Sequence, residues 1–211
     1  MRVSQFVALA LTAVSTVSAV TLQQFTRPQC YGAKRLCSNI GPGICCQSKS
    51  RVFASGNCVG CTSTDFHTVW NQNGRNYCGR VASSRNGGGC TGGQNLRGHT
   101  WCRLCRTKRM VERGFEGEVL EGIQKREAEA VQNGQELHDD AECKESVEPD
   151  LVTLDDKRFF KINYAVSEAD TKAILDWIEG ENPEYSALSS HLMQHETQFD
   201  LYAEELGGKK E

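Results

Sequence analysis

Beyond residue 20, the sequence of 211 residues contains no apolar run near the length that crosses a bilayer. We therefore expect no membrane anchor.

The motifs of several enzyme classes are also missing. We find no serine-hydrolase elbow, no paired glycosidase carboxylates, no zinc-protease helix and no nucleotide-binding loop. We expect no enzyme activity, no bound metal and no cofactor.

The first nineteen residues have the pattern of a signal peptide. Arg2 supplies a positive charge, an apolar stretch follows from Phe6 to Val17, and small residues end it at Ala19. The signal peptide would direct the chain to secretion and would be cut off after Ala19. The sequence predicts a secreted, extracellular protein.

Large apolar residues are scarce in the following part of the chain, whereas cysteine is abundant. Ten of the 11 cysteines form one dense group: Cys30, Cys37, Cys45, Cys46, Cys58, Cys61, Cys78, Cys90, Cys102 and Cys105. A small secreted domain with little apolar area to bury needs cross-links, so we interpret this group as a disulfide framework. The spacing does not determine the connectivity. The eleventh, Cys143, stands alone and is either free or links two chains.

Two CxxC pairs, Cys58 with Cys61 and Cys102 with Cys105, also fit a zinc site. Behind a signal peptide, with further cysteines interleaved, disulfides are the favoured interpretation.

Charge divides the chain into two halves. Residues 20–126 carry 16 Lys and Arg against five Asp and Glu, whereas residues 127–211 carry seven against 22. The net charges are therefore +11 and −15. These opposite charges suggest that the acidic half pairs with the basic half and masks it.

The basic half predicts a small, mainly-β, disulfide-rich domain over residues 20–109. Gly and Asn clusters separate short stretches rich in β-branched and aromatic residues, at 51–54, 66–70, 77–81 and 99–102. Short strands at that spacing are typical of a small antiparallel sheet or sandwich.

The acidic half predicts a linker and then a short helical segment. Residues 110–157 read as an acidic, disordered linker that contains the processing site. In the segment 158–211, residues 158–166 alternate like a strand, and Ser167 would cap a helix that stops at Gly180. A second, longer helix is predicted from Pro183, because apolar residues recur every three or four positions from Tyr185 to Leu206.

Dibasic pairs offer sites for a processing protease of the kexin type: Lys125-Arg126, Lys108-Arg109 and Lys157-Arg158. The run from Lys125 to Ala130 reads Lys-Arg-Glu-Ala-Glu-Ala and resembles the processing spacer of yeast mating-pheromone precursors. That resemblance implies cleavage after Arg126 and trimming of the two Glu-Ala pairs. The alternative is a short exposed helix in which the alternation is coincidental.

A secreted ribonuclease is a further hypothesis. It needs a general base, a general acid and a cation near a phosphate, and His67, His99 and Arg97 could supply them if the fold brought them together.

The layout as a whole resembles that of fungal killer-toxin and small cysteine-rich effector precursors. This resemblance implies a toxin-like or antimicrobial factor, with the acidic half as a pro-region or as a second chain. The net charge of +12 over residues 20–109 favours an anionic membrane, a cell-wall surface or nucleic acid as target. The alternative is a host-directed effector or cell-surface interaction protein without toxic activity.

Overall fold

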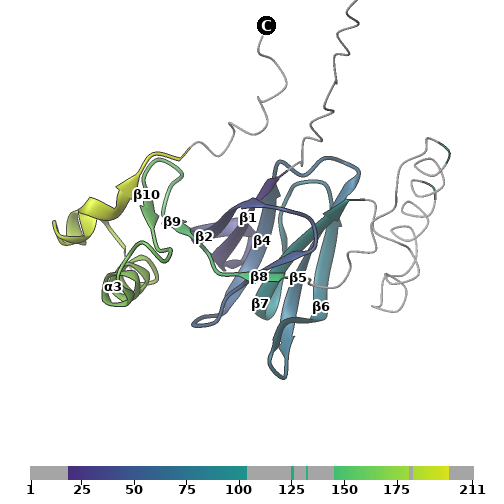
Figure 1. Ribbon diagram of the computed structural model, residues 1–211, viewed down its shortest axis with the longest axis horizontal. Helices are drawn as coiled ribbons and strands as arrows, with labels where there is room; N and C mark the ends of the chain where they lie inside the picture. Colours follow the sequence, from purple (N-terminus) through teal and green to yellow (C-terminus); the bar gives the residue numbers. More distant parts are fainter. Residues whose placement is uncertain (1–18, 104–124, 126–131, 133–144, 181–182, 200–211) are drawn as a thin grey trace, which may run out of the picture.

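Strands from both halves of the chain join in one sheet (Figure 1). The computed structural model describes residues 19–103, 125, 132, 145–180 and 183–199. The strands of the basic half are β1 (Val20–Arg27), β2 (Tyr31–Ile40), β3 (Ile44–Gln47), β4 (Phe53–Val59), β5 (Asp65–Asn73), β6 (Asn76–Asn86) and β7 (Thr91–Arg103). Those of the acidic half are β8 (Glu145–Val147), β9 (Leu151–Thr153), β10 (Phe159–Lys161) and β11 (Glu196–Thr197). The predicted mainly-β, disulfide-rich class is confirmed.

The strand order is β11-β10-β9-β2-β1-β4-β7-β3-β8, and β5 pairs with both β6 and β7. All pairs are antiparallel except β3 with β8. The long strand β7 connects the parts, since its first half pairs with β4 and its second half with β5, while Gly98 and His99 also pair with β3. Because β7 pairs with three other strands along its length, the sheet bends around it and encloses a core.

Four of these strands lie where the sequence predicts them. The stretches 51–54, 66–70, 77–81 and 99–102 overlap β4, β5, β6 and β7. The hairpin between β5 and β6 turns at Gly74, whose φ of +58° lies in the left-handed region that glycine adopts at little cost.

Buried apolar residues lie on the inner faces of these strands. One cluster joins Leu22, Ile40 and Trp101, and the indole of Trp101 donates to the carbonyl of Ile40 at 2.8 Å. A second cluster joins Phe53, Val69 and Leu96. Neither cluster is large, which fits a domain that depends on cross-links.

Four disulfides supply those cross-links. They pair Cys30 with Cys90, Cys37 with Cys46, Cys45 with Cys78, and Cys58 with Cys61. Cys102 is disulfide-bonded as well. Cys105 and Cys143 lie outside the described residues.

The predicted disordered linker over residues 110–157 is wrong in its last part. Residues 145–153 include β8 and β9, and Leu151, Val152 and Thr153 are buried. The low apolar content of this region misled the prediction, because three residues are enough to add a strand to the free edge of β2. Most of residues 110–144 lie outside the described residues.

The first predicted helix is confirmed as α3 (Glu168–Ile178). The side chain of Ser167 accepts a hydrogen bond from the backbone N–H of Asp170 at 3.1 Å, as expected of an N-cap. The predicted strand before it is shorter than expected, since β10 ends at Lys161.

The predicted second helix does not form over residues 183–199. The chain instead makes two short 3₁₀ turns, Tyr185–Ala187 and Leu192–His195. Ser186, Ser189 and Ser190 interrupt the helical pattern, since serine competes for backbone hydrogen bonds. Leu188 and Leu192 are still buried, against Phe160, Ile174 and Ile178.

Candidate functional site

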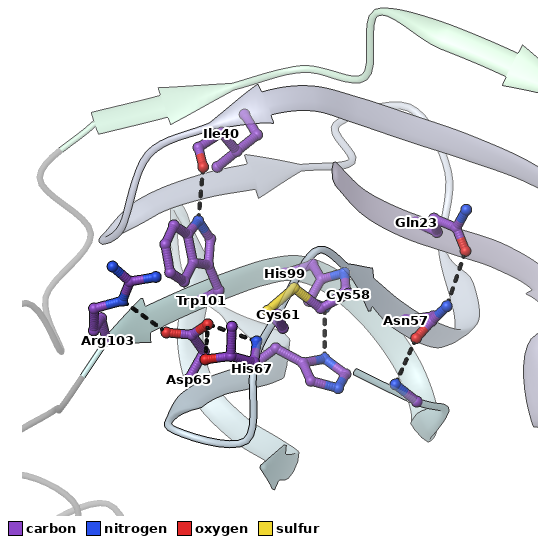
Figure 2. The surroundings of a disulfide bond; sticks show 12 residues. Gln23, Ile40, Asn57, Cys58, Cys61, Asp65, His67, His99, Trp101 and Arg103 are labelled. Carbon is purple, nitrogen blue, oxygen red and sulfur yellow. Dashed lines mark hydrogen bonds and ion pairs between the residues drawn. A yellow bond between two sulfur atoms is a disulfide. The ribbon is translucent and has the colours of Figure 1, made fainter. Parts of the chain in front are cut away.

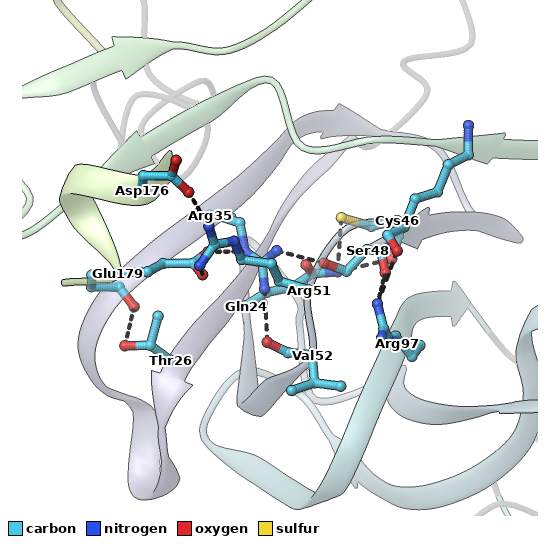
Figure 3. A network of polar contacts seen from close by, with 12 residues as sticks. Gln24, Thr26, Arg35, Cys46, Ser48, Arg51, Val52, Arg97, Asp176 and Glu179 are labelled. Atoms are coloured by element: carbon cyan, nitrogen blue, oxygen red, sulfur yellow. Dashed lines mark hydrogen bonds and ion pairs between the residues drawn. The ribbon is translucent and has the colours of Figure 1, made fainter. Parts of the chain in front are cut away.

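The most distinctive site is a group of four cations on the basic half, which we call the cationic face: Lys34, Arg35, Lys49 and Arg51. Lys34 and Arg35 lie on β2, whereas Lys49 and Arg51 lie on the connection from β3 to β4. Figure 3 shows Arg35 and Arg51 beside Asp176 of α3 and Glu179, which follows the end of that helix.

Every cation of this face meets a carboxylate from the acidic half. Arg51 pairs with Asp176 and, at 2.9 Å, with Glu179. Lys34 pairs with Asp156. The described acidic segment therefore neutralises these four charges of the basic half.

Lys49 pairs with Glu148 at 2.5 Å, and both side chains are about half exposed. The ion pair raises the pKa of Lys49, chiefly through its hydrogen bond to Glu148. An exposed pair of this kind contributes little to stability.

Arg35 is, together with Lys34, one of the two buried members of the cationic face. It donates from Nη1 to Ser48 Oγ at 2.6 Å and from Nη2 to the carbonyl of Val52 at 3.1 Å. Its Nε lies 3.8 Å from Glu179 Oε1, which is too long for a hydrogen bond. Burial lowers the pKa of Arg35, and the charge of Glu179 opposes that shift. The neighbouring carboxylate thus offsets part of the cost of burying this guanidinium.

Backbone pairing fixes the acidic segment to the same strands. β9 continues the sheet beyond β2, with Arg35 opposite Val152 and Leu36 opposite Leu151. Leu36, Leu151 and Phe159 form one buried cluster across this junction. The sequence signal for the junction is weak, because the only cues are the short apolar groups Leu151-Val152 and Phe159-Phe160.

A carboxylate of the connection between β8 and β9 anchors the segment a second time. Asp150 Oδ1 accepts a hydrogen bond from the backbone N–H of Ser38 at 2.9 Å, and Oδ2 accepts one from the Ser38 hydroxyl. In Figure 1, β8 and β9 lie alongside strands of the basic half, whereas α3 and β10 lie at one end of the sheet.

The two histidines of the ribonuclease hypothesis do come together, but inside the protein. Nδ1 of His67 lies 3.0 Å from Nε2 of His99, and both residues are fully buried (Figure 2). Burial lowers the pKa of His67 to about 4 and that of His99 well below its usual range. Neither ring can therefore reach an RNA phosphate in the folded protein.

Arg97 does not join the histidines. It donates from Nη1 to the carbonyls of Ser48 and Lys49, at 3.2 and 2.9 Å, next to the cationic face (Figure 3). The acid of the same region, Asp65, is also buried and pairs with Arg103 at 3.1 Å (Figure 2). The geometry gives no support to a ribonuclease site built from these residues.

The zinc interpretation of Cys58 and Cys61 is not supported either, because the two residues form a disulfide with each other (Figure 2). Within the described residues, no group of three or more His, Cys, Asp or Glu side chains is arranged to hold a metal ion.

The dibasic pairs differ in their surroundings. Arg126, Lys108 and Arg109 lie outside the described residues, and Lys125 is exposed. Lys157 is exposed as well, but Arg158 is held by Glu196 through two contacts of 2.7 Å. The guanidinium of Arg158 also lies over the ring of Tyr185, 4.5 Å from its centroid.

A second set of cations has no carboxylate partner among the described residues. Arg75, Arg80 and Arg85 are exposed on the hairpin of β5 and β6, which joins the sheet through the pairing of β5 with β7. We call these three residues the hairpin arginines.

Comparison of the chain with protein-family models, with curated proteins and with solved structures finds no match. Among the described residues, no helix is both long and apolar enough to span a membrane. Multiple disulfides are typical of secreted or extracellular proteins.

Proposed function

We propose that this protein is an extracellular interaction protein whose acidic segment, residues 145–199, stays bound as a permanent part of the binding unit. One observation carries the proposal: β9 pairs with β2 at a buried junction, next to the ion pairs of the cationic face. Release of the segment would expose Leu36 and leave the buried Arg35 without its nearest carboxylate.

Cleavage at Lys125-Arg126 by a kexin-type protease would then leave two chains that remain associated. The connection between the halves contains the cut, while the contacts that join them lie elsewhere. Burial of each large apolar side chain at the junction is worth about 1.5–3 kcal/mol, and this contribution is insensitive to salt. Ion pairs add to it but weaken as salt rises.

The experiment is to cut the secreted protein after Arg126 and measure its size by gel filtration under native conditions. A Cys143→Ser variant removes the one cysteine of the acidic half, so that any association is noncovalent. We expect the two chains to elute together at both low and high salt. Separation at either salt concentration would show that the acidic half is a pro-region, and would overturn the proposal.

A second candidate function is a toxin-like or antimicrobial factor that acts on an anionic membrane. The hairpin arginines favour it, because they are exposed and no described carboxylate neutralises them. Leakage of vesicles that contain anionic lipid should then fall steeply with salt. Replacement of the three hairpin arginines by glutamine should abolish leakage, and a matched Lys157→Gln, Lys161→Gln and Lys172→Gln variant should not.

A further inference from the structure

A groove of about 730 Å³ lies where the two halves of the chain meet. The basic half contributes the ends of β2 and β3, including Asn39 and Gln47. The acidic half contributes residues 146–150 and the region from Ile162 to Thr171. The groove is complete only while the halves are associated, so an inference about it rests on the proposed function.

The walls of the groove carry hydrogen-bonding groups that the described protein leaves free. Asn39, Gln47, Tyr164, Glu168 and Thr171 all line it, and none of their side chains bonds to another described residue. Amides and hydroxyls can both donate and accept, whereas the carboxylate only accepts. A ligand with many hydroxyl groups can satisfy this mixture, because each hydroxyl is itself both a donor and an acceptor.

Tyr164 adds a flat apolar surface at the rim. Its side chain is 101% exposed, so no part of the described protein packs on either face of the ring. An aromatic ring combines a large apolar face with a polar hydroxyl, which suits a ligand that is apolar on one side and polar at its edges. A sugar ring has this character, with C–H groups on its faces and hydroxyls around its edge.

The charges of the groove disfavour an anion. Its lysine, Lys49, is already paired with Glu148 at 2.5 Å. Asp150 is bonded to Ser38 and Glu168 has no cationic partner among the described residues, so the groove carries excess negative charge. Phosphate, sulfate and nucleic acid are therefore poor ligands for it.

We propose that this groove binds a neutral oligosaccharide, with one sugar ring stacked on Tyr164 and its hydroxyls bonded to Asn39, Gln47 and Thr171. The volume lies within the range of about 300–1,000 Å³ that is typical of small-ligand sites. A cell-wall surface then becomes a target through its neutral glycans rather than through its negative charge.

The test is calorimetric titration of the full-length secreted protein with three neutral hexasaccharides: cellohexaose, laminarihexaose and chitohexaose. We expect at least one to bind. Tyr164→Ala should weaken that binding about tenfold, which corresponds to the loss of one stacking contact. Gln47→Ala should weaken it less.

Tyr31→Ala is the matched control, because Tyr31 is also an exposed tyrosine, at 66%, but lies outside the groove. It should bind as the unaltered protein does. A heparin hexasaccharide supplies the anionic arm and should not compete. The proposal is overturned if no neutral hexasaccharide binds at millimolar concentration, if Tyr164→Ala binds normally, or if the heparin fragment displaces the ligand.

The titration is run on the uncut chain, in which the covalent connection keeps the halves at a high effective concentration. The titration tests the groove proposal, and the gel filtration of the cut protein tests the proposed function. A failure of one can therefore be distinguished from a failure of the other. If the cut chains separate while the uncut chain binds sugar, the groove is real and the permanent association is not.

Discussion

The imidazoles of His67 and His99 meet with Nδ1 and Nε2 3.0 Å apart, and the outer nitrogen of each ring is buried as well. The two residues come from the neighbouring strands β5 and β7, and Val69 of β5 lies directly opposite His99. Such a pair is tolerated only while both rings are neutral, because a buried cation would have no carboxylate beside it.

We expect stability to fall as the pH drops from about 6.5 to about 4. Burial lowers the pKa of His67 to about 4, whereas in the unfolded chain its pKa is near 6.5. Between these pH values His67 is protonated in the unfolded state but not in the folded state, so protonation favours unfolding. The loss from His67 is on the order of 3 kcal/mol below pH 4.

Urea unfolding at pH 7 and at pH 4 measures this loss. A His67→Gln variant should show a smaller difference between the two pH values than the unaltered protein. His195→Gln is the control, since His195 is only part-buried and, unlike His67, has a carboxylate beside it, that of Asp170. An equal pH dependence in all three proteins would show that the buried pair does not control acid stability.

Gly56 on β4 makes room for the same pair. A Cβ atom at this position would lie 2.9 Å from His99 Cε1 and 2.9 Å from Val69 Cγ1. We expect Gly56→Ala to destabilise the protein by about 1–3 kcal/mol through overpacking. Thermal unfolding would show this against Gly41→Ala, whose added Cβ meets only Ile44 Cδ1, at 3.5 Å. Equal midpoints for the two variants would contradict the prediction.

Much of the β architecture could be predicted from the sequence, whereas the way the halves join could not. The strands β4 to β7 follow from alternating residues between glycine-rich turns. β9 is only three residues long and lies in an acidic stretch, so the amino-acid composition of that stretch does not indicate a strand. The contact between His67 and His99 depends on the register of β5 against β7, which no local pattern encodes. The groove depends on both, because its walls come from opposite halves.

Glu179 and Asp176 allow the ion pairs of the cationic face to be compared. Both pair with Arg51, but Glu179 is 11% exposed and also faces the buried Arg35, whereas Asp176 is 42% exposed. Glu179→Gln should cost about 3 kcal/mol, because it leaves a buried guanidinium without a carboxylate. Asp176→Asn should change stability little, because solvent screens its pair. Urea unfolding of the two isosteric variants measures the contrast, and a larger loss from Asp176→Asn would contradict it.

Arg158 should resist a processing protease while Glu196 holds it. A dibasic cleft must take the arginine side chain, but that guanidinium contacts Glu196 twice at 2.7 Å and lies over Tyr185. The next residue, Phe159, is buried in β10. In a time course with a kexin-type protease, followed by mass spectrometry, we expect cleavage after Arg126 well before cleavage after Arg158.

Glu196→Ala should speed the cut after Arg158, because it frees the arginine side chain that the protease must bind. Glu184→Ala removes an exposed carboxylate that pairs with no described cation, and it should leave the rate unchanged. Cleavage of the unaltered protein after Arg158 as fast as after Arg126 would show that the hairpin of β9 and β10 opens freely, and that the acidic segment is held less firmly than its contacts imply.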